Sequence, residues 1–352
     1  MELLSVTMND GVMPRSEMEG KDNSSEDKSN YKIVRKGDMV YNSMRMWQGA
    51  NGISPCDGIV SPAYTVLMPK QEINNGYFAA LFKSVTLINE FRKNSQGMTS
   101  DTWNLKYPQI ETIKVQIPSV SEQDKVSELF GVLDARIVAQ AQLVESLKKY
   151  KRGVSDYLFL QNSKMPIHCK WKQFSFGDVV EINPKTPPLP EQFIYIDLEC
   201  VESGQLKSLN YINKNHAPSR AQRVLCRNDV LFQMVRPYQK NNYLYRDIFD
   251  GPVVASTGYA QIRCSECNPF FVYEQISSEQ FSREAMMRST GTGYPAINAD
   301  GLAQIPFYVP TPEEQEKIGV FLSALGAKIA KESEILAALD IVKKALMQQL
   351  FT

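Results

Sequence analysis

Few residues in this sequence have the types and spacing that catalysis requires. The loop of an adenine methyltransferase is Asn/Asp-Pro-Pro-aromatic, and the nearest match, Asn183-Pro184-Lys185, lacks the second proline and the aromatic residue. Gly291-Thr292-Gly293 would suit a phosphate loop only within a Gly-x-Gly-x-x-Gly frame, which the sequence does not have. The chain also has no Walker motif. We therefore predict no catalytic residue and no cofactor in this chain.

Metal-dependent and nucleophilic chemistry is equally poorly supported. Cys264-Ser-Glu-Cys267 is a single Cys-x-x-Cys pair, whereas a structural zinc site needs four ligands, usually as two spaced pairs. The chain's two histidines lie in no catalytic motif. The acidic cluster Glu122–Lys125 recurs at Glu314–Lys317, where a helix start explains it, because acidic residues stabilise the first turn. We predict no metal site.

Length and composition describe an ordinary globular chain of about two domains. It has 352 residues, of which 43% are hydrophobic and 22% charged. Lysine plus arginine equals aspartate plus glutamate at 39 each, so the net charge is zero, which argues against a strongly basic DNA-coating protein. Six cysteines are too few for a disulfide framework and fit a reducing cytoplasm. We expect neither a membrane span nor a secretory signal, because no long apolar run and no basic leader occur.

One long segment of the sequence occurs twice. Residues 117–159 align with 309–351 without a gap at an offset of 192, and 11 of the 43 positions are identical. Recurrence at a fixed offset indicates one structural unit used twice. The recurring opening comprises Pro118, Glu122, Gln123 and Lys125, which return as Pro310, Glu314, Gln315 and Lys317.

Each copy carries the seam of a two-helix coiled coil. Positions that alternate by four and three residues are apolar at eight of ten places in both copies, which is the a/d pattern of packed helices. The polar places also match, since Gln140 aligns with Glu332 and Lys151 with Lys343. The seam residues that we assign are Leu133, Ile137, Val144, Leu147, Leu325, Ile329, Leu336 and Leu339.

We expect helices at about 121–160 and 313–350, with Ser121 and Thr311 near their starts. A single such helix would more simply be a surface helix on a core. Two matched copies, each following a different module, favour a pair that packs antiparallel as a rigid spacer.

The segments before the two helices are related more weakly. Lys36–Asn42 matches Arg227–Gln233, because each places an aspartate in a polar turn before a β-prone run and then reaches Arg45 or Arg236. Both segments consist of short β patterns broken by Gly, Asn and Pro, with a helical pattern in each. The sequence predicts an α+β fold, in which two β-rich mixed modules are separated by a long antiparallel two-helix coiled coil with an internal pseudo-two-fold repeat.

Domain boundaries are expected where these patterns change. The first module spans 1–118 and its spacer helix 119–160; a linker follows at 161–170; the second module spans 171–310 and its spacer helix 311–352.

The first module is expected to be short at its N-terminal side. Gly11 corresponds to Gly204, an offset of 193, so Met1 aligns with Ile194 and residues 171–193 of the second module have no counterpart in the first. The unmatched part includes a strand-like pattern from Trp171 to Ile182.

The order of these parts resembles the specificity subunit of type I restriction–modification systems. A β-rich module is followed by a long helix that opens with Pro-x-x-x-Glu-Gln-x-Lys, and both then occur a second time. The Gly37-Asp38 strand opening and the helix ends Leu147-Lys148-Lys149 and Val342–Leu346 are also typical of that family. The resemblance covers the whole chain.

The resemblance implies two target recognition domains, each reading one half of a bipartite DNA sequence, with helices that set the distance between the halves. It implies as partners double-stranded DNA, two methyltransferase (modification) subunits docked on the helices, and restriction/translocase subunits, but no membrane. Adenine methylation and DNA cleavage, with S-adenosylmethionine, ATP and magnesium, would belong to those subunits, in the cytoplasm of a bacterium or archaeon. The residues alone leave open a stand-alone DNA methyltransferase or nuclease, and a non-DNA two-helix scaffold.

Candidate DNA-binding side chains gather mainly in the loops after the matched strands. Arginine, lysine, asparagine and glutamine make the contacts that read base edges in the major groove. Each side chain taken singly is also explained as a solvated surface residue, but both modules place an arginine and amides after the same strand. We expect DNA contacts from Arg45, Gln48 and Asn51 in the first module and from Arg220, Arg223, Arg236, Gln239, Lys240, Asn241 and Asn242 in the second.

Overall fold

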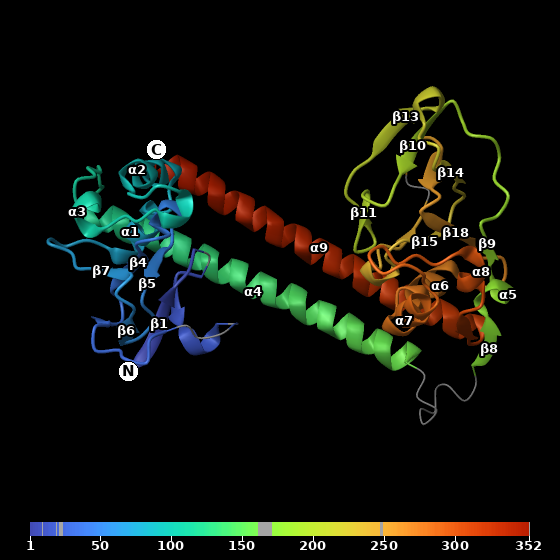
Figure 1. Cartoon of the computed structure of the whole chain (residues 1–352), viewed down its shortest axis with the longest axis horizontal. Coiled ribbons are helices and arrows are strands. Elements are labelled where there is room, and N and C mark those ends of the chain that lie inside the picture. Colours follow the sequence, from blue (N-terminus) through green and yellow to red (C-terminus); the bar gives the residue numbers. More distant parts are fainter. Residues whose placement is uncertain (9, 19, 21–23, 161–170, 247–248, 352) are drawn as a thin grey trace. The chain divides into compact units, whose positions relative to one another are not determined.

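The computed structural model divides into two compact units (Figure 1). Unit 1 comprises Met1–Gln142 with Ser333–Thr352, and unit 2 comprises Leu143–Glu332. The structure describes residues 1–8, 10–18, 20, 24–160, 171–246 and 249–351, so the expected linker 161–170 lies outside the described residues. Each long helix contributes one part to each unit, whereas the sequence pattern assigned the helices to domains of their own. The domain boundaries stay a prediction.

The β part of unit 1 is built from short strands, which are β1 (Glu2–Val6), β2 (Val12–Pro14), β3 (Lys32–Val34), β4 (Met39–Asn42), β5 (Asn51–Ile53), β6 (Gly58–Val60) and β7 (Tyr64–Leu67). They form two sheets with the orders β2-β1-β6-β3 and β5-β4-β7. β1 and β6 are parallel, and the other neighbouring pairs are antiparallel. Leu4, Val40 and Val60 belong to the core of this part.

Short helices connect these sheets to the long helices. They are η1 (Arg15–Glu17), η2 (Met46–Gln48), α1 (Asn75–Leu81), α2 (Val85–Asn94), η3 (Ser100–Thr102) and α3 (Tyr107–Ile110). The side chains of Asn74 and Ser84 accept hydrogen bonds from the first turns of α1 and α2, which fixes where each helix begins. Tyr77 and Phe91 pack from these helices into an aromatic core.

Unit 2 contains β8 (Lys172–Ser175), β9 (Glu181–Ile182), β10 (Gln192–Ile196), β11 (Val201–Glu202), β12 (Gln205–Leu206), β13 (Asn210–Asn213), β14 (Ala221–Val224), β15 (Val230–Gln233), β16 (Tyr243–Leu244), β17 (Val253–Ser256), β18 (Tyr259–Arg263) and β19 (Pro306–Val309). The larger sheets have the orders β13-β10-β17-β14 and β16-β15-β18-β9, and two further pairs are β11-β12 and β19-β8. Its helices are α5 (Phe176–Val179), η5 (Lys214–His216), η6 (Pro237–Gln239), α6 (Pro269–Ile276), α7 (Glu279–Met287) and α8 (Ala299–Ala303).

The two units share one topology. The sheet β2-β1-β6-β3 corresponds to β13-β10-β17-β14, with a parallel central pair in both, and β5-β4-β7 corresponds to β16-β15-β18. Unit 2 has β8 and β9 in addition, and both come from the segment 172–182 that the sequence comparison leaves without a counterpart. The predicted α+β fold with an internal repeat is confirmed.

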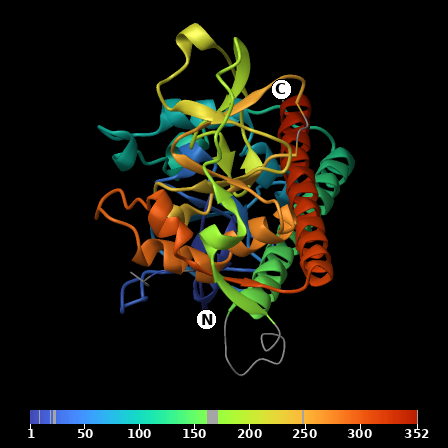
Figure 2. The same cartoon turned by 90° about the vertical axis from the view of Figure 1, so that its right-hand side faces the viewer.

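The long helices α4 (Val120–Phe159) and α9 (Pro312–Leu350) pack antiparallel in each unit. In unit 1 the start of α4 meets the end of α9, where the rings of Phe130 and Phe351 stack with centroids 5.8 Å apart. In unit 2 the end of α4 meets the start of α9, where Leu158 packs on the core that contains Leu322. Figures 1 and 2 show the helices side by side within each unit. The antiparallel pairing expected from the repeat is confirmed.

The assigned seam residues of both helices are all buried or half-buried. Leu350, which the same pattern places in the seam, is instead 43% exposed, and the next residue, Phe351, is buried. Polar residues flank the seam on both helices. Among the described residues, no helix has the apolar length to cross a membrane.

Both long helices begin with the same cap, and its position corrects one prediction. α4 begins at Val120, so Ser121 lies inside its first turn, and Ser119 is the residue that precedes the helix. Glu122 Oε2 accepts from the backbone N and Oγ of Ser119 at 3.1 and 2.8 Å. At α9 the predicted Thr311 does pair with Glu314 in this way. The carboxylate thereby satisfies one backbone N–H at each helix start, and at α9 the Thr311 hydroxyl also accepts from the backbone N of Glu314 at 3.4 Å.

A buried glutamine joins α4 to the module of unit 1. Gln123 Oε1 accepts a hydrogen bond from the backbone N of Asn74 at 2.9 Å, and Gln123 Nε2 donates to the carbonyl of Pro118 at 2.9 Å. Asn74 is the cap of α1, so this one side chain fixes the long helix against the start of a module helix.

Unit 2 repeats this arrangement with Gln315. Its Oε1 accepts from the backbone N of Asn268, the cap of α6, at 2.9 Å, and its Nε2 donates to the carbonyl of Pro310 at 3.1 Å. Both glutamine side chains are almost completely buried. We call the contacts of Gln123 and of Gln315 the glutamine joints, and they explain why the Pro-x-x-x-Glu-Gln pattern recurs.

We predict that Gln315→Ala lowers the free energy of unfolding by about 1–3 kcal/mol, because the buried Asn268 N–H and Pro310 carbonyl lose their partner. Urea unfolding followed by circular dichroism measures the change, and Gln304→Ala, an exposed glutamine of the same unit, is the matched control. Equal unfolding midpoints for both variants and the unmodified chain would contradict a stabilising joint.

Candidate nucleic-acid interface

The predicted arginines occupy equivalent places in the two units. β4 and β15 each lead into a loop with one 3-10 turn, and Arg45 and Arg236 are the residues that immediately precede η2 and η6. Both turns end in the left-handed backbone region, at Gly49 with φ 85° and at Lys240 with φ 53°. We call residues 43–50 and 234–242 the recognition loops. They are the same structural feature, although their sequences differ.

In unit 2 the recognition loop packs against a second loop. A β-bridge between Thr290 and Ala296 closes this second loop. Arg236 donates its backbone N–H to the carbonyl of Pro295 at 2.7 Å, and its guanidinium lies 4.2 Å from the ring centroid of Tyr294. Tyr294 is 70% exposed. The arginine is thus positioned by an aromatic ring that itself faces solvent, a cation–π arrangement.

Unit 1 has a comparable cluster in the equivalent place. A β-bridge between Gln96 and Asn104 closes its second loop, which carries Trp103. The Trp103 ring meets that of Trp47 edge-on with centroids 5.1 Å apart, and the guanidinium of Arg92 lies 5.8 Å from the Trp47 centroid. Each unit therefore places an arginine beside an aromatic ring where two loops meet, but in unit 1 that arginine is Arg92, and not the predicted Arg45.

Two of the predicted amides are buried and cannot present their side chains to DNA in this conformation. Asn51 is fully buried, and its Nδ2 donates to the carbonyl of Gly49 at 3.1 Å. Asn242 is also buried, and its Oδ1 accepts from the backbone N of Gln233 at 2.9 Å. The sequence pattern marked both as loop amides, but the loops use them to satisfy their own backbone groups. We remove both from the set of candidate base contacts.

The remaining polar side chains of the second recognition loop differ in their exposure and in the hydrogen-bond partners that they already have. Gln239 is exposed, although its Oε1 accepts from Gln233 Nε2 at 2.8 Å. Asn241 Oδ1 accepts from the backbone N of Ser203 at 3.1 Å. Lys240 forms an ion pair with Glu279, and this hydrogen bond lowers the pKa of the glutamate. Gln239 is therefore better placed for a new partner than Asn241 or Lys240, whereas Gln48 in unit 1 is half-buried within η2.

Arg220 and Arg223 lie at β14, in the other sheet of unit 2. Arg220 is exposed, and its carbonyl accepts from Thr257 N at 2.8 Å, one residue before Gly258, whose carbonyl accepts from Met234 N. This turn brings Arg220 near the base of the recognition loop. Arg223 is half-buried, and desolvation lowers its guanidinium pKa.

Neither metal-binding nor nucleophilic groups converge at these loops. Within the described ranges, no group of three or more His, Cys, Asp or Glu side chains could hold a metal ion. Cys264 and Cys267 are free thiols, and burial raises the pKa of Cys264 to about 12 and also raises that of Cys267. The loops offer guanidinium groups, amides and exposed rings, which suit stacking and hydrogen bonding with a nucleic acid.

The family model for the type I restriction modification DNA specificity domain matches residues 5–149 and 169–340, which is most of the chain. The chain belongs to this family. Specificity subunits of type I restriction–modification systems are non-catalytic DNA-recognition subunits, in agreement with the prediction from sequence.

Known relatives agree with this assignment. The specificity subunit of the type I restriction enzyme MjaVIII from Methanocaldococcus jannaschii is 22% identical over 345 residues, covering 91% of this chain and 79% of that protein. The HindI specificity subunit from Haemophilus influenzae is 24% identical over 195 residues, covering 51% of this chain and 40% of that protein.

Two solved structures share the fold of this specificity subunit. The S subunit of a type I system from M. genitalium has a TM-score of 0.61 at 14% identity, and covers 91% of this chain and 84% of that one. A chain solved in work on complex assembly and conformational transition of the type I R-M system has a TM-score of 0.54 at 16% identity, covering 93% and 84%.

Sequence reasoning missed the aromatic members of both clusters. Trp47, Trp103 and Tyr294 are not among the DNA-binding residues predicted from the sequence. The only local signal is the turn composition around them, Trp47-Gln-Gly in unit 1 and Gly293-Tyr294-Pro295 in unit 2. The contacts join residues about 55 positions apart in the chain, so no local pattern shows them.

We predict that Arg236→Ala relaxes sequence choice in one half-site only, at a cost of about 1–3 kcal/mol, which is the loss expected for a bidentate base contact. Arg236→Lys is the matched variant, because it keeps the positive charge but lacks the planar guanidinium that makes bidentate hydrogen bonds. It is expected to lose nearly as much specificity. Binding to matched and mismatched DNA measures both. A uniform loss across all DNA sequences, with a salt slope reduced by about one charge, would make Arg236 a phosphate contact instead.

Proposed function

We propose that this specificity subunit reads a bipartite double-stranded DNA sequence, with one half read by each unit, and directs adenine methylation and DNA cleavage by partner subunits. The observation that carries the proposal is the repeated topology, in which each unit places a recognition loop beside a bridged loop that carries an aromatic side chain, Trp103 in unit 1 and Tyr294 in unit 2. S-adenosylmethionine, ATP and magnesium belong to the partners. The work of such a complex on cellular DNA places it in the bacterial or archaeal cytoplasm.

The two long helices set the spacing between the half-sites. Each is one uninterrupted helix that contributes residues to both units, and a glutamine joint holds the start of α4 in unit 1 and the start of α9 in unit 2. An α-helix rises about 1.5 Å per residue, so the number of residues in each helix would determine the distance between the two DNA-reading modules.

Inserting four residues between Ala139 and Glu145, with a matched insertion between Lys331 and Ala337, is expected to lengthen the gap between half-sites and leave their bases unchanged. Four residues add about 6 Å, close to two base steps of about 3.4 Å each. Both helices must be changed, because an insertion of four in one of them unwinds the seam. Methylation mapping provides the readout. Altered half-site bases at unchanged spacing would contradict the proposal that the helices set the spacing.

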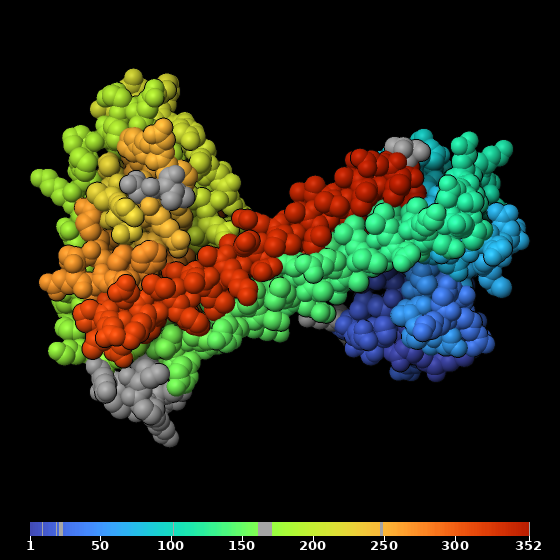
Figure 3. Space-filling model, turned by 180° about the vertical axis from the view of Figure 1, so that it is seen from behind, coloured from blue at the N-terminus to red at the C-terminus, as the bar shows by residue number. Residues whose placement is uncertain are grey.

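The helices also carry surfaces that suit the methyltransferase subunits. In unit 2, exposed Tyr150, Tyr157 and Phe321 line an apolar cleft of about 750 Å³ between α4 and α9. At the offset of 192, Tyr150 corresponds to Val342 and Phe321 to Leu129, and both of these are exposed in unit 1. Figure 3 shows the outer surfaces of both helices uncovered by the β modules. Two versions of one apolar surface suit two copies of one partner.

Removing either surface is expected to remove one methyltransferase subunit. The double variant Tyr150→Ser/Phe321→Ser should weaken binding of one copy at least about tenfold, and Leu129→Ser/Val342→Ser that of the other, because aromatic and aliphatic anchors dominate such interfaces. Native mass spectrometry counts the copies bound, and Tyr211→Ser, an exposed tyrosine on β13, is the control. Two retained copies in both double variants would show that the partner docks elsewhere.

A further inference from the structure

The two units differ in charge at one corresponding segment, the crossover that joins the two edge strands of the four-stranded sheet with the parallel central pair. In unit 1 the crossover leads from β2 to β3 through residues 15–31, which include three basic and five acidic residues. In unit 2 it leads from β13 to β14 through residues 214–220, which include Lys214, His216 and Arg220 and no acidic residue. Corresponding segments of the two units therefore carry opposite charge.

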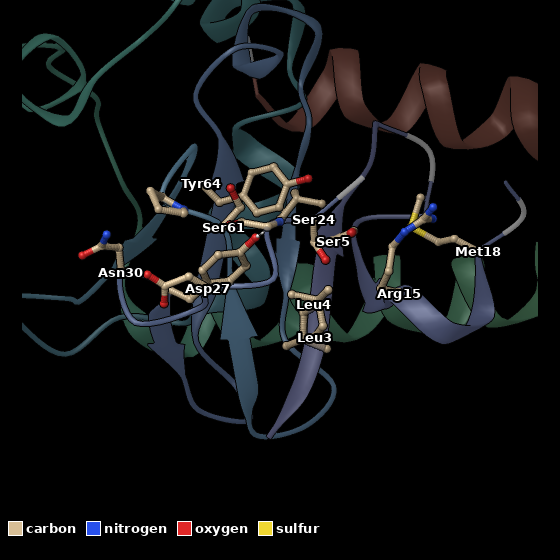
Figure 4. A pocket seen from close by; sticks show the side chains of 14 residues that line it. Leu3, Leu4, Ser5, Arg15, Met18, Ser24, Asp27, Asn30, Ser61 and Tyr64 are labelled. Carbon is tan, nitrogen blue, oxygen red and sulfur yellow. Dashed lines mark hydrogen bonds between the residues drawn. The ribbon is translucent and has the colours of Figure 1, made fainter. Parts of the chain in front are cut away.

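The crossover of unit 1 holds one of its carboxylates in the charged form. Asp27 Oδ1 accepts a hydrogen bond from the backbone N of Ser29 at 2.9 Å, and this bond lowers the pKa of the carboxyl. Figure 4 shows Asp27 and Arg15 among the side chains that line a hollow of about 690 Å³ beside Leu3. Because like charges repel, an acidic crossover disfavours the approach of a phosphate backbone.

The crossover of unit 2 and a second segment cover one face of the sheet β13-β10-β17-β14. Ala217 of the crossover packs on a small core formed by this sheet, and so does Leu189 of residues 184–190. The second segment also bonds to an edge of the sheet, because Thr186 Oγ1 donates to the carbonyl of Gln222 in β14 at 3.2 Å. We call residues 184–190 and 214–220 together the basic surface of unit 2.

The backbone that carries the exposed Lys185 is stiff. Its segment, residues 184–190, reads Pro-Lys-Thr-Pro-Pro-Leu-Pro, and each of the four prolines fixes its own φ near about −65°. A side chain on a fixed backbone has less conformational entropy to lose when it binds. Lys185 is therefore suited to a contact with an external anion.

The other two cations of the basic surface are also accessible. Lys214 Nζ lies 3.1 Å from Glu191 Oε1, in an ion pair whose side chains are 44% and 81% exposed. Such exposed pairs contribute little to stability, so a phosphate can take the place of Glu191. Arg220 is exposed as well.

The basic surface adjoins the second recognition loop at Arg220. The Arg220 carbonyl accepts from the backbone N of Thr257 at 2.8 Å, and the carbonyl of the next residue, Gly258, accepts from the backbone N of Met234 at 3.0 Å. Met234 is the first residue of the recognition loop. The cations of the basic surface are thus continuous with the loop that is proposed to read bases.

We propose that the basic surface of unit 2 binds the phosphate backbone of double-stranded DNA through Lys185, Lys214 and Arg220, whereas the acidic crossover of unit 1 does not. This inference rests on the function proposed above. Phosphate contacts position a duplex without selecting its bases. Unit 2 therefore supplies the larger part of the salt-dependent attraction to DNA, and the two half-sites are held with unequal strength.

The test measures binding of the full chain to two duplexes, one with the methylated target and one of random sequence, between about 50 and 200 mM salt. Lys185→Gln/Lys214→Gln is expected to weaken binding to both duplexes alike, at least about tenfold at about 50 mM salt. The slope of log K against log salt should become less steep by about two, because each phosphate contact contributes about 0.9. Lys185→Arg/Lys214→Arg keeps both charges and should bind as the unmodified chain does.

The matched control is Arg15→Gln/Lys28→Gln, which removes two basic residues from the crossover of unit 1 and is expected to leave the slope unchanged. An unchanged slope in the unit 2 glutamine variant, an equal change in the control, or an arginine variant as weak as the glutamine variant would overturn the proposal. So would a loss confined to the target duplex, because the lysines would then select bases. If the unmodified chain does not prefer the target duplex, the proposed base reading fails, while the slopes still decide about the basic surface.

Discussion

The structure depends on the two glutamine joints. A side-chain amide that both accepts and donates is a short, directional connection, and its burial makes loss of either bond unfavourable. Gln123 and Gln315 each connect a long helix to the cap of a module helix. Because the neighbouring carboxylates of Glu122 and Glu314 cap the same helix starts, one short motif sets where each helix begins and which module surface it meets. Such stiff attachments suit the proposed reading of two DNA segments at a fixed spacing.

Charge pairing within the chain limits how strongly it can attract DNA. The net charge is zero, and several basic side chains are already engaged, since Arg263 bonds to the buried Asp229 and Lys343 to Asp134. In unit 2 Lys151 bonds at 3.0 Å to Glu274, whose carboxyl pKa is raised by burial despite that lysine. Affinity for DNA rises with the number of phosphates that free cations neutralise. We therefore expect the isolated subunit to bind DNA weakly and the methyltransferase subunits to strengthen binding.

The sequence alone predicted the features that occur twice in the chain or that follow a regular spacing of apolar residues. The helices, their antiparallel pairing and the equivalence of Arg45 and Arg236 all follow from matched positions at nearly constant offsets. It also recorded that Gln123 recurs as Gln315, but not why, because the partner Asn74 is 49 residues away. It failed for Asn51 and Asn242, since an amide in a loop can serve DNA or its own backbone, and only the folded loop decides. The aromatic clusters were not predicted for the same reason, because their members come into contact only in the folded chain.

The central claim is that two equivalent units, fixed to one pair of helices, read two separate DNA segments. Mapping methylated adenines in cells that contain this subunit and its methyltransferase tests it most directly. The account predicts a motif of two defined blocks separated by a run of unspecified bases of constant length. A single contiguous motif, or two blocks whose separation varies from site to site, would contradict it.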